Sequence, residues 1–283
     1  MDPIKINNRQ LDHWIVFLMI AILAIGLASD VNAGGDRWSE LKANYFGDRD
    51  ITTGDEIITM DAPTRAHDAA TVPIVLKALD PARQIKQVHL IVDKNPIPLA
   101  GIFKFSEESA NWESLETRIR INEYTDVRAI AELDDGSLHM TSRFIKAAGG
   151  CSAPAMADLD AAMLRAGKMQ VLFDTNNADG ASSAEAVIKI SHPNNSGMQF
   201  DQISRNYIPA FFVHTIAAEL NGKPLIDVET NFSMSENPVV RLNFTPATVS
   251  AQSATAMVVY AEDSKGNRYE KSLELEQALV VQQ

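Results

Sequence analysis

The stretch TDVRAIAELDDGSLHMTSRFI, residues 125–145, indicates the class of fold. Residues 125–133 and 138–145 are short apolar or alternating runs of the kind that form strands, and Asp135-Gly136 lies in the connection between them. Asp-Gly favours the tight turn of a β-hairpin, because both central positions of that turn need a positive φ. The stretch therefore predicts two antiparallel strands joined by a tight turn.

Similar short runs, separated by turn residues, fill the rest of the first half of the chain. Asp80-Pro81 and Asn95-Pro96-Ile97-Pro98 are two of these separators. We expect strands over residues 57–61, 72–78, 87–92, 100–105, 115–121, 125–133 and 138–145. Seven strands with no long helix between them predict an antiparallel sandwich. Apolar residues at helical spacing within residues 36–48 predict a short helix ahead of it.

A second series of strands is expected in the second half of the chain, and Asn221-Gly222 is its strongest hairpin signal. These strands are expected over residues 186–191, 210–220, 223–229, 239–244, 254–262 and 268–275. Between the two series, Ser152 is a possible helix cap and Gly167 a possible helix end, and residues 174–184 are small and polar, as in a linker. The sequence thus predicts an all-β chain: two immunoglobulin-like antiparallel β-sandwiches joined by a short helix and a linker.

The composition indicates a folded, acidic protein. Hydrophobic residues make up 46% and charged residues 22% of the 283 residues, and the formal net charge is -12. Negative charge of this size disfavours nucleic acid and anionic membrane surfaces as partners.

The N-terminal segment, residues 1–33, has the pattern of a signal peptide. Lys5 and Arg9 precede an apolar run over residues 14–27, and Val31-Asn32-Ala33 offers the small residues of a cleavage site. The run is short for a membrane span, which needs about 20 residues. We expect an exported protein with no membrane span after cleavage; an uncleaved N-terminal anchor is the alternative.

Cys151 is the only cysteine in the chain and follows Gly149 and Gly150. A lone cysteine excludes an intramolecular disulfide and a multi-cysteine metal site. Two glycines give the backbone ahead of the thiol unusual freedom, which suggests a flexible arm and a covalent carrier. If a helix begins at Ser152, its positive end is expected to lower the pKa of the Cys151 thiol below about 8.5.

Other signatures of catalysis are missing from the sequence. There is no P-loop, Gly-x-Ser-x-Gly or Gly-x-Gly-x-x-Gly motif. The histidines after the signal segment have no metal-binding spacing; they are His67, His89, His139, His192 and His214. We therefore expect no catalytic residue, no metal site and no cofactor. A cysteine–histidine enzyme remains the alternative, although a flexible arm is a poor platform for catalytic geometry.

Several ordered motifs resemble the two subunits of a bacterial sulfur-oxidation (Sox) carrier. The first half resembles SoxY in IVDKNPIP (91–98), ETRIR (116–120), AELDDGS (131–137) and Gly149-Gly150-Cys151. The second half resembles SoxZ in ISHP (190–193), IPAFF (208–212), NGK (221–223), SENP (235–238) and DSKG (263–266). The whole is similar to a fused SoxYZ-like carrier of the type associated with quinoprotein dehydrogenases that use pyrroloquinoline quinone (PQQ).

The resemblance implies a periplasmic protein that is not an enzyme. It divides the chain into a signal peptide (1–33), a SoxY-like sandwich (34–148), an arm, helix and linker (149–184) and a SoxZ-like sandwich (185–283). It makes Cys151 the attachment site of a sulfur intermediate, with Gly149 and Gly150 as the arm. The implied partners are Sox-type enzymes, or a PQQ dehydrogenase and its cytochrome; the alternative role is a non-covalent accessory protein of such a dehydrogenase.

One departure from SoxY concerns the arm. In SoxY, Gly-Gly-Cys-Gly-Gly ends the chain, whereas here Ser152-Ala153 follow the cysteine and the chain continues to Gln283. A thiol anchored on both sides sweeps a smaller volume than a free end, because each extended residue reaches only about 3.3 Å. We therefore expect a reactive loop rather than a free tip.

Overall fold

The computed structural model describes residues 37–154, 159–176, 183–202, 204–246 and 254–275. The chain divides into two compact units, Met1–Tyr45 and Phe46–Gln283. Helix α2 (Arg37–Phe46), which ends at the boundary of the first unit, confirms the helix expected within residues 36–48. Among the described residues, no helix has the length and apolar character needed to cross a membrane. The second unit holds all the described strands.

The strands of the first half follow the apolar runs of the sequence. They are β1 (Ile51–Thr53), β2 (Ile58–Asp61), β3 (Val72–Ala78), β4 (Ile85–Val92), β5 (Leu99–Phe105), β6 (Asn111–Ile119), β7 (Thr125–Leu133) and β8 (Leu138–Ile145). A 3-10 turn, η1 (Glu107–Ser109), precedes β6. Strands β7 and β8 pair as the predicted hairpin, and Gly136 in their turn has φ +80°. All seven expected strands are present, and β1 is additional.

The second half is also built of strands, with one short helix before them. The elements are α3 (Leu159–Arg165), β9 (Met169–Asn176), β10 (Ser183–Ile190), β11 (Phe200–Asp201), β12 (Asn206–Tyr207), β13 (Val213–Leu220), β14 (Lys223–Thr230), β15 (Val239–Thr245), β16 (Ala256–Asp263) and β17 (Arg268–Glu274). Asn221 and Gly222, with φ of 51° and 75°, form the expected tight turn between β13 and β14.

The segment expected to be a linker, residues 174–184, is partly strand. Residues 174–176 end β9 and residues 183–184 begin β10, and the two strands pair with Asn176 opposite Ser183. Residues 177–182 between them lie outside the described residues. The polar residues thus connect two strands of one hairpin.

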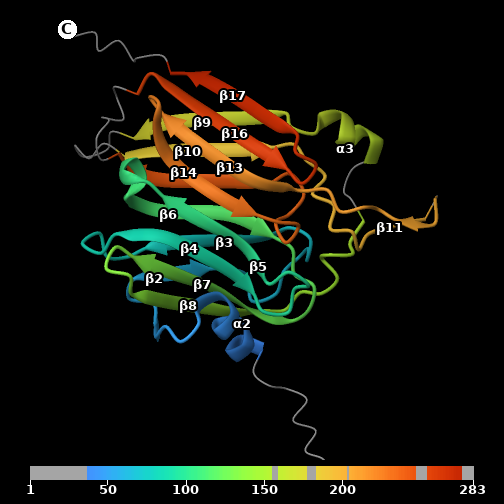
Figure 1. Ribbon diagram of the computed structural model, residues 1–283, viewed down its shortest axis with the longest axis horizontal. Helices are drawn as coiled ribbons and strands as arrows, with labels where there is room; N and C mark the ends of the chain where they lie inside the picture. The colour runs from blue at the N-terminus through green and yellow to red at the C-terminus, as the bar shows by residue number, and fades with distance from the viewer. Residues whose placement is uncertain (1–36, 155–158, 177–182, 203, 247–253, 276–283) are drawn as a thin grey trace, which may run out of the picture. The chain divides into compact units, whose positions relative to one another are not determined.

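The two halves are joined strand to strand into two continuous sheets (Figure 1). The larger sheet has the order β1-β8-β7-β4-β5-β14-β13-β16-β17, and the smaller β2-β3-β6-β15-β10-β9. Strand β5 pairs antiparallel with β14, and β6 pairs antiparallel with β15. Each pairing gives the backbone groups of two would-be edge strands a partner, which removes an edge from each sandwich. The all-β prediction is confirmed, and the sandwiches meet through hydrogen-bonded strands as well as through the connecting chain.

One apolar core runs between the two sheets. In β7 the inward residues Val127, Ala129, Ala131 and Leu133 are fully buried, as the period of two along a strand requires. The buried cluster includes residues of both halves, such as Phe103 and Val228, which face each other in the β5–β14 register. Ile119, at the end of β6, forms an isolated antiparallel bridge with Met234, so this end of β6 lies where the halves meet.

Candidate functional site

The only thiol lies in a short turn that packs against the segment after β6. We call residues 149–152 the Cys151 turn. The Gly149 N–H donates to the carbonyl of Asn122 at 2.9 Å, and the Gly150 N–H donates to the carbonyl of Ile121 at 2.9 Å. The Ser152 N–H closes the turn onto the carbonyl of Gly149 at 3.2 Å. Cys151 itself has 0% of its surface exposed. The glycine arm is thus docked, and the thiol is covered.

Gly150 fits a slot that no side chain could enter. A Cβ built at this position would lie 2.0 Å from the carbonyl oxygen of Ala69 and 2.7 Å from that of Ile121. Both neighbours are backbone atoms, and the Ile121 N–H already binds the Ala69 carbonyl at 2.8 Å. Gly149 differs, because space around it is open but its φ of +82° favours glycine. The two glycines therefore seat the turn for different physical reasons.

Arg120 is a buried cation that ties the turn to the second half of the chain. Its side chain is 1% exposed. Its Nη1 donates to the carbonyl of Gly150 at 3.2 Å, and its Nη2 donates to the carbonyl of Asn194 at 3.3 Å. Its Nε has no hydrogen-bond partner among the described residues. One guanidinium thus spans the Cys151 turn and a loop of the other half.

The same loop also contacts the turn directly. The Ser196 hydroxyl donates to the carbonyl of Cys151, and the Ser196 N–H donates to Oε1 of Gln199 at 2.8 Å. Ser196 and Gln199 are both buried. Residues from both halves therefore build the seat of the thiol.

Burial raises the pKa of the Cys151 thiol to about 11, and the charge of Arg120 only partly offsets this effect. The expected lowering of the pKa is therefore wrong. Helix α3 begins only at Leu159, and residues 155–158 lie outside the described chain. No helix begins at Ser152 to stabilise the thiolate, so the loss of hydration on burial decides the pKa of the Cys151 thiol. At pH 7 about one docked molecule in 10⁴ would hold a thiolate.

The described residues offer no catalytic partner for this thiol. The Cys151 sulfur makes no hydrogen bond to a histidine in the described part of the chain. His192 is buried, and burial lowers its pKa to about 4; its Nε2 lies 3.8 Å from Asp263, beyond hydrogen-bond distance. Within the described ranges, no group of three or more His, Cys, Asp or Glu residues is arranged to hold a metal ion.

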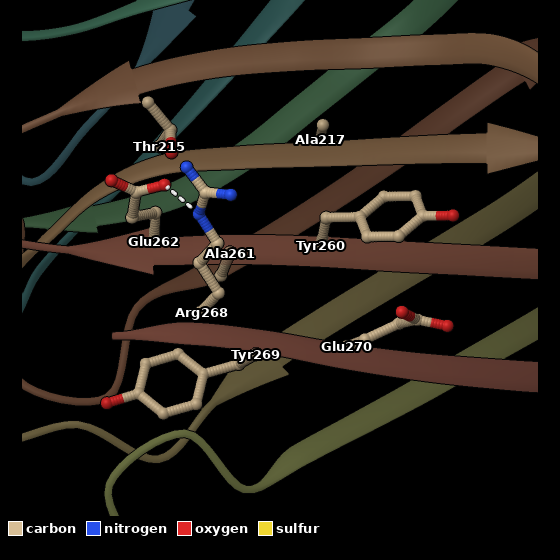
Figure 2. A pocket seen from close by; sticks show the side chains of 8 residues that line it. All are labelled: Thr215, Ala217, Tyr260, Ala261, Glu262, Arg268, Tyr269 and Glu270. Carbon is tan, nitrogen blue, oxygen red and sulfur yellow. Dashed lines mark hydrogen bonds and ion pairs between the residues drawn. The ribbon is translucent and has the colours of Figure 1, made fainter. Parts of the chain in front are cut away.

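A separate groove on the outer face of the larger sheet has a volume of about 360 Å³ and lacks Cys151 (Figure 2). It is lined by Thr215, Ala217, Tyr260, Ala261, Glu262, Arg268, Tyr269 and Glu270. Figure 2 shows the Arg268 guanidinium directed at Glu262, and the pair lies at 2.8 Å. These charges neutralise each other, so the Cys151 turn is the stronger candidate.

No sequence pattern predicted a role in the site for three residues, Arg120, Ser196 and Gln199. Strand alternation places Arg120 on the same side as Arg118, which is exposed. However, β6 ends at Ile119, and Ile119, Arg120 and Ile121 are all buried. The loop of the other half contacts Arg120, and no local pattern reports such a contact.

Comparison with known families gives two matches, one in each half of the chain. Residues 42–151 match the family described as "Sulfur oxidation protein SoxY", and residues 174–274 match "Sulphur oxidation protein SoxZ". Together the matches span most of the chain after the N-terminal segment, and the first ends at Cys151. A comparison with curated proteins found no match.

Two solved structures show weaker likenesses. The sulfur carrier protein SoxY from Chlorobium limicola f thiosulfatophilum is 19% identical, with a TM-score of 0.33; the match covers 39% of this chain and 91% of that one. A superoxide reductase (neelaredoxin) from Ignicoccus hospitalis is 14% identical, with a TM-score of 0.29, and the match covers 34% of this chain and 94% of that one. The assignment therefore rests on the two family matches: this chain is a fusion of a SoxY domain with a SoxZ domain, and SoxYZ proteins are sulfur carriers rather than enzymes.

Proposed function

We propose that this protein is a periplasmic carrier that holds a sulfur intermediate covalently on Cys151 for the enzymes of a Sox-like pathway. One observation carries the proposal: the only cysteine of the chain closes the SoxY match. A second supports it, since groups of both domains, Arg120 and Ser196, hold the turn that bears this thiol.

Loading is a thiol–disulfide type of exchange. The thiol first gives its proton to solvent, and the thiolate then attacks a sulfur–sulfur bond in a donor presented by a partner enzyme. One sulfur–sulfur bond forms on Cys151, the donor bond breaks, and its electron pair leaves with the departing sulfur. No net oxidation is required. A second exchange releases the cargo.

The docked turn is the resting form in this scheme. A buried thiol with a pKa of about 11 reacts slowly, because the thiolate is the nucleophile. The turn must therefore leave its seat before exchange. Docking protects the free thiol from unwanted oxidation in an oxidising compartment.

The finer assignment adds a location and a partner. We propose export by the signal segment over residues 1–33, and association with a quinoprotein dehydrogenase that uses PQQ, together with its cytochrome. Cell fractionation with N-terminal sequencing of the mature protein tests the first part; residence in the cytoplasm would contradict it. Co-purification from the native host tests the second.

The direct test of the carrier role is intact-mass spectrometry of protein purified from its native host. We expect a mass increase equal to one or more sulfur-containing groups, removed by a reductant and absent from the Cys151→Ala variant. A chain that never carries an adduct, together with full pathway activity in the Cys151→Ala strain, would refute the proposal.

One observation favours a second candidate, a non-covalent accessory protein of a PQQ dehydrogenase. The thiol is fully buried, and its pKa is raised rather than lowered. This candidate predicts that the Cys151→Ser variant still binds the dehydrogenase and supports its full activity. The carrier proposal predicts that the same variant binds the partner and loses the pathway's turnover.

A further inference from the structure

A groove with a volume of about 480 Å³ crosses the outer face of the smaller sheet where the two domains meet. The SoxY domain contributes Arg118 on β6, and the SoxZ domain contributes Lys189 on β10; Lys168, between the two family matches, lies just ahead of β9. We call it the cationic groove. Its walls come from both domains, so the groove exists only because the domains are joined.

Three cations of this groove have no partner within the described ranges. Arg118, Lys168 and Lys189 make no side-chain ion pair or hydrogen bond with any described residue. Arg241, in the same groove, is instead paired with Glu185 at 3.0 Å and with Glu116 at 3.4 Å. Two carboxylates, Glu116 and Glu236, also line the groove, so its four cations outnumber its carboxylates by two. In a chain with a net charge of -12, this local excess of positive charge favours an anionic ligand.

The spacing of the cations indicates what kind of anion fits. Lys189 lies opposite Val239 of β15 and Gln170 of β9. Arg118 lies on β6, on the other side of β15, because Arg241 of β15 is opposite Glu116. Two strand spacings therefore separate Arg118 from Lys189, or about 10 Å. This is the separation of the two backbones, and an extended acidic segment places carboxylates at comparable intervals along the groove.

The groove adjoins the segments that hold the thiol. Arg118 lies close in the sequence to Arg120, which binds the carbonyl of Gly150. The Ser191 N–H donates to the carbonyl of Lys168 at 2.8 Å, and the Ser235 N–H donates to that of Arg118 at 3.0 Å. The segments that line the groove thus continue into segments that hold the Cys151 turn.

We propose that the cationic groove docks an acidic segment of the partner protein that exchanges cargo with Cys151. The inference rests on the carrier function for the identity of the partner, and on the charge and geometry of the groove for the class of ligand. It adds a recognition surface outside the thiol and its arm.

The test is binding of a fluorescent hexaglutamate peptide to the full chain, followed by fluorescence anisotropy at low and high salt. We expect binding that weakens as salt rises. In the Arg118→Gln/Lys189→Gln variant the dissociation constant should rise about fivefold, as the loss of two exposed charge pairs would give. Lys77→Gln is the matched control, because Lys77 is an exposed residue of β3 in the same sheet and does not line the groove; it should leave binding unchanged.

Three results would overturn the proposal. They are the absence of peptide binding, an equal loss of binding in the Lys77→Gln control, and displacement of the peptide by sulfate at an ionic strength where chloride does not displace it, which would indicate a small-oxyanion site. Adduct mass on Cys151 is measured in the same proteins. Peptide binding without any adduct would reject the carrier function and leave the groove intact, whereas adducts without peptide binding would reject only the groove.

Discussion

The guanidinium of Arg120 donates from Nη1 to the carbonyl of Gly150 at 3.2 Å, so a buried charge holds the backbone next to the only thiol. The opposite side of the same guanidinium binds the carbonyl of Asn194 in the SoxZ domain. Burying a cation is costly unless its donors are used. Arg120 therefore links two events: opening of the Cys151 turn and loosening of the contact between the domains.

Replacing Arg120 with Gln should release the thiol. The variant loses two charge-assisted hydrogen bonds, each worth about 1.5–3 kcal/mol. We expect the reaction of Cys151 with an aromatic disulfide reagent to accelerate at least about tenfold, the factor that about 1.4 kcal/mol corresponds to. Lys77→Gln, at an exposed position of β3 outside the groove, is the control and should react at the wild-type rate. Equal rates in wild type and Arg120→Gln would show that Arg120 does not hold the turn.

Gly150→Ala should unseat the turn by a purely steric route. The added Cβ would lie 2.0 Å from the Ala69 carbonyl oxygen, and backbone cannot move aside as a flexible side chain can. We expect a faster reaction with the aromatic disulfide reagent, measured by release of the aromatic thiol, and a Cys151 pKa nearer its ordinary value of about 8.5, measured by thiolate absorbance as the pH is varied. Gly149→Asn is the comparison, since space around Gly149 is open and Asn tolerates a positive φ. If the Gly150→Ala thiol reacts at the wild-type rate and keeps the wild-type pKa, the site around Gly150 has room for a side chain and the steric argument is wrong.

Cys151 should make stability fall in alkaline solution. The thiol's pKa is about 11 when folded and about 8.5 when unfolded, so between these values the unfolded chain loses the proton that the native chain keeps. Fewer protons on the unfolded state mean that stability falls as pH rises, by about 3 kcal/mol across the window. Denaturant titrations of wild type and Cys151→Ala from pH 8 to 11 measure the difference. If the unfolding free energies of the two proteins change with pH in the same way, burial does not raise the pKa of the Cys151 thiol.

Asn95 should matter for stability as a bridge between the domains. Its Nδ2 donates to the carbonyl of Arg120 at 2.8 Å and to the Ser233 hydroxyl at 3.1 Å, and its Oδ1 accepts from the Asn122 N–H at 2.9 Å. Asn95→Ala leaves buried partners unsatisfied, so we expect a loss of about 2–4 kcal/mol of unfolding free energy. Asn122→Ala serves as the control, because only the Asn122 backbone takes part in this bridge. A loss for Asn95→Ala no larger than that of a typical surface substitution, about 0.5 kcal/mol, would show that the bridge is weak.

The sequence predicted the strands well because their signals are local. The ranges 72–78, 125–133 and 138–145 agree with β3, β7 and β8 residue for residue. Strand β9 was not among the expected strands, and its last residues, Asp174, Thr175 and Asn176, fall in the predicted linker because they are polar; β9 is a sheet-edge strand. Edge strands carry polar residues that read as loop.

The site was predicted in part. Cys151, Gly149 and Gly150 were named from spacing and resemblance, but their docked state was not. Burial of the thiol depends on Arg120 and Ser196, of which the first lies well before it in the sequence and the second well after it. Contacts across such distances leave no periodic trace, and the pairing of β5 with β14 escaped the sequence for the same reason. Local sequence patterns predict turns and strands, whereas the exposure and the pKa of the Cys151 thiol depend on tertiary contacts.

The strand pairing of β5 with β14 and of β6 with β15 has a consequence for mass action. Two separate subunits joined in this way would part on dilution, at a concentration set by their dissociation constant. In a single chain the second domain stays at an effective concentration in the millimolar range, however dilute the protein becomes. The seat of the thiol, which needs groups from both domains, thus remains assembled at any abundance of the protein in the cell.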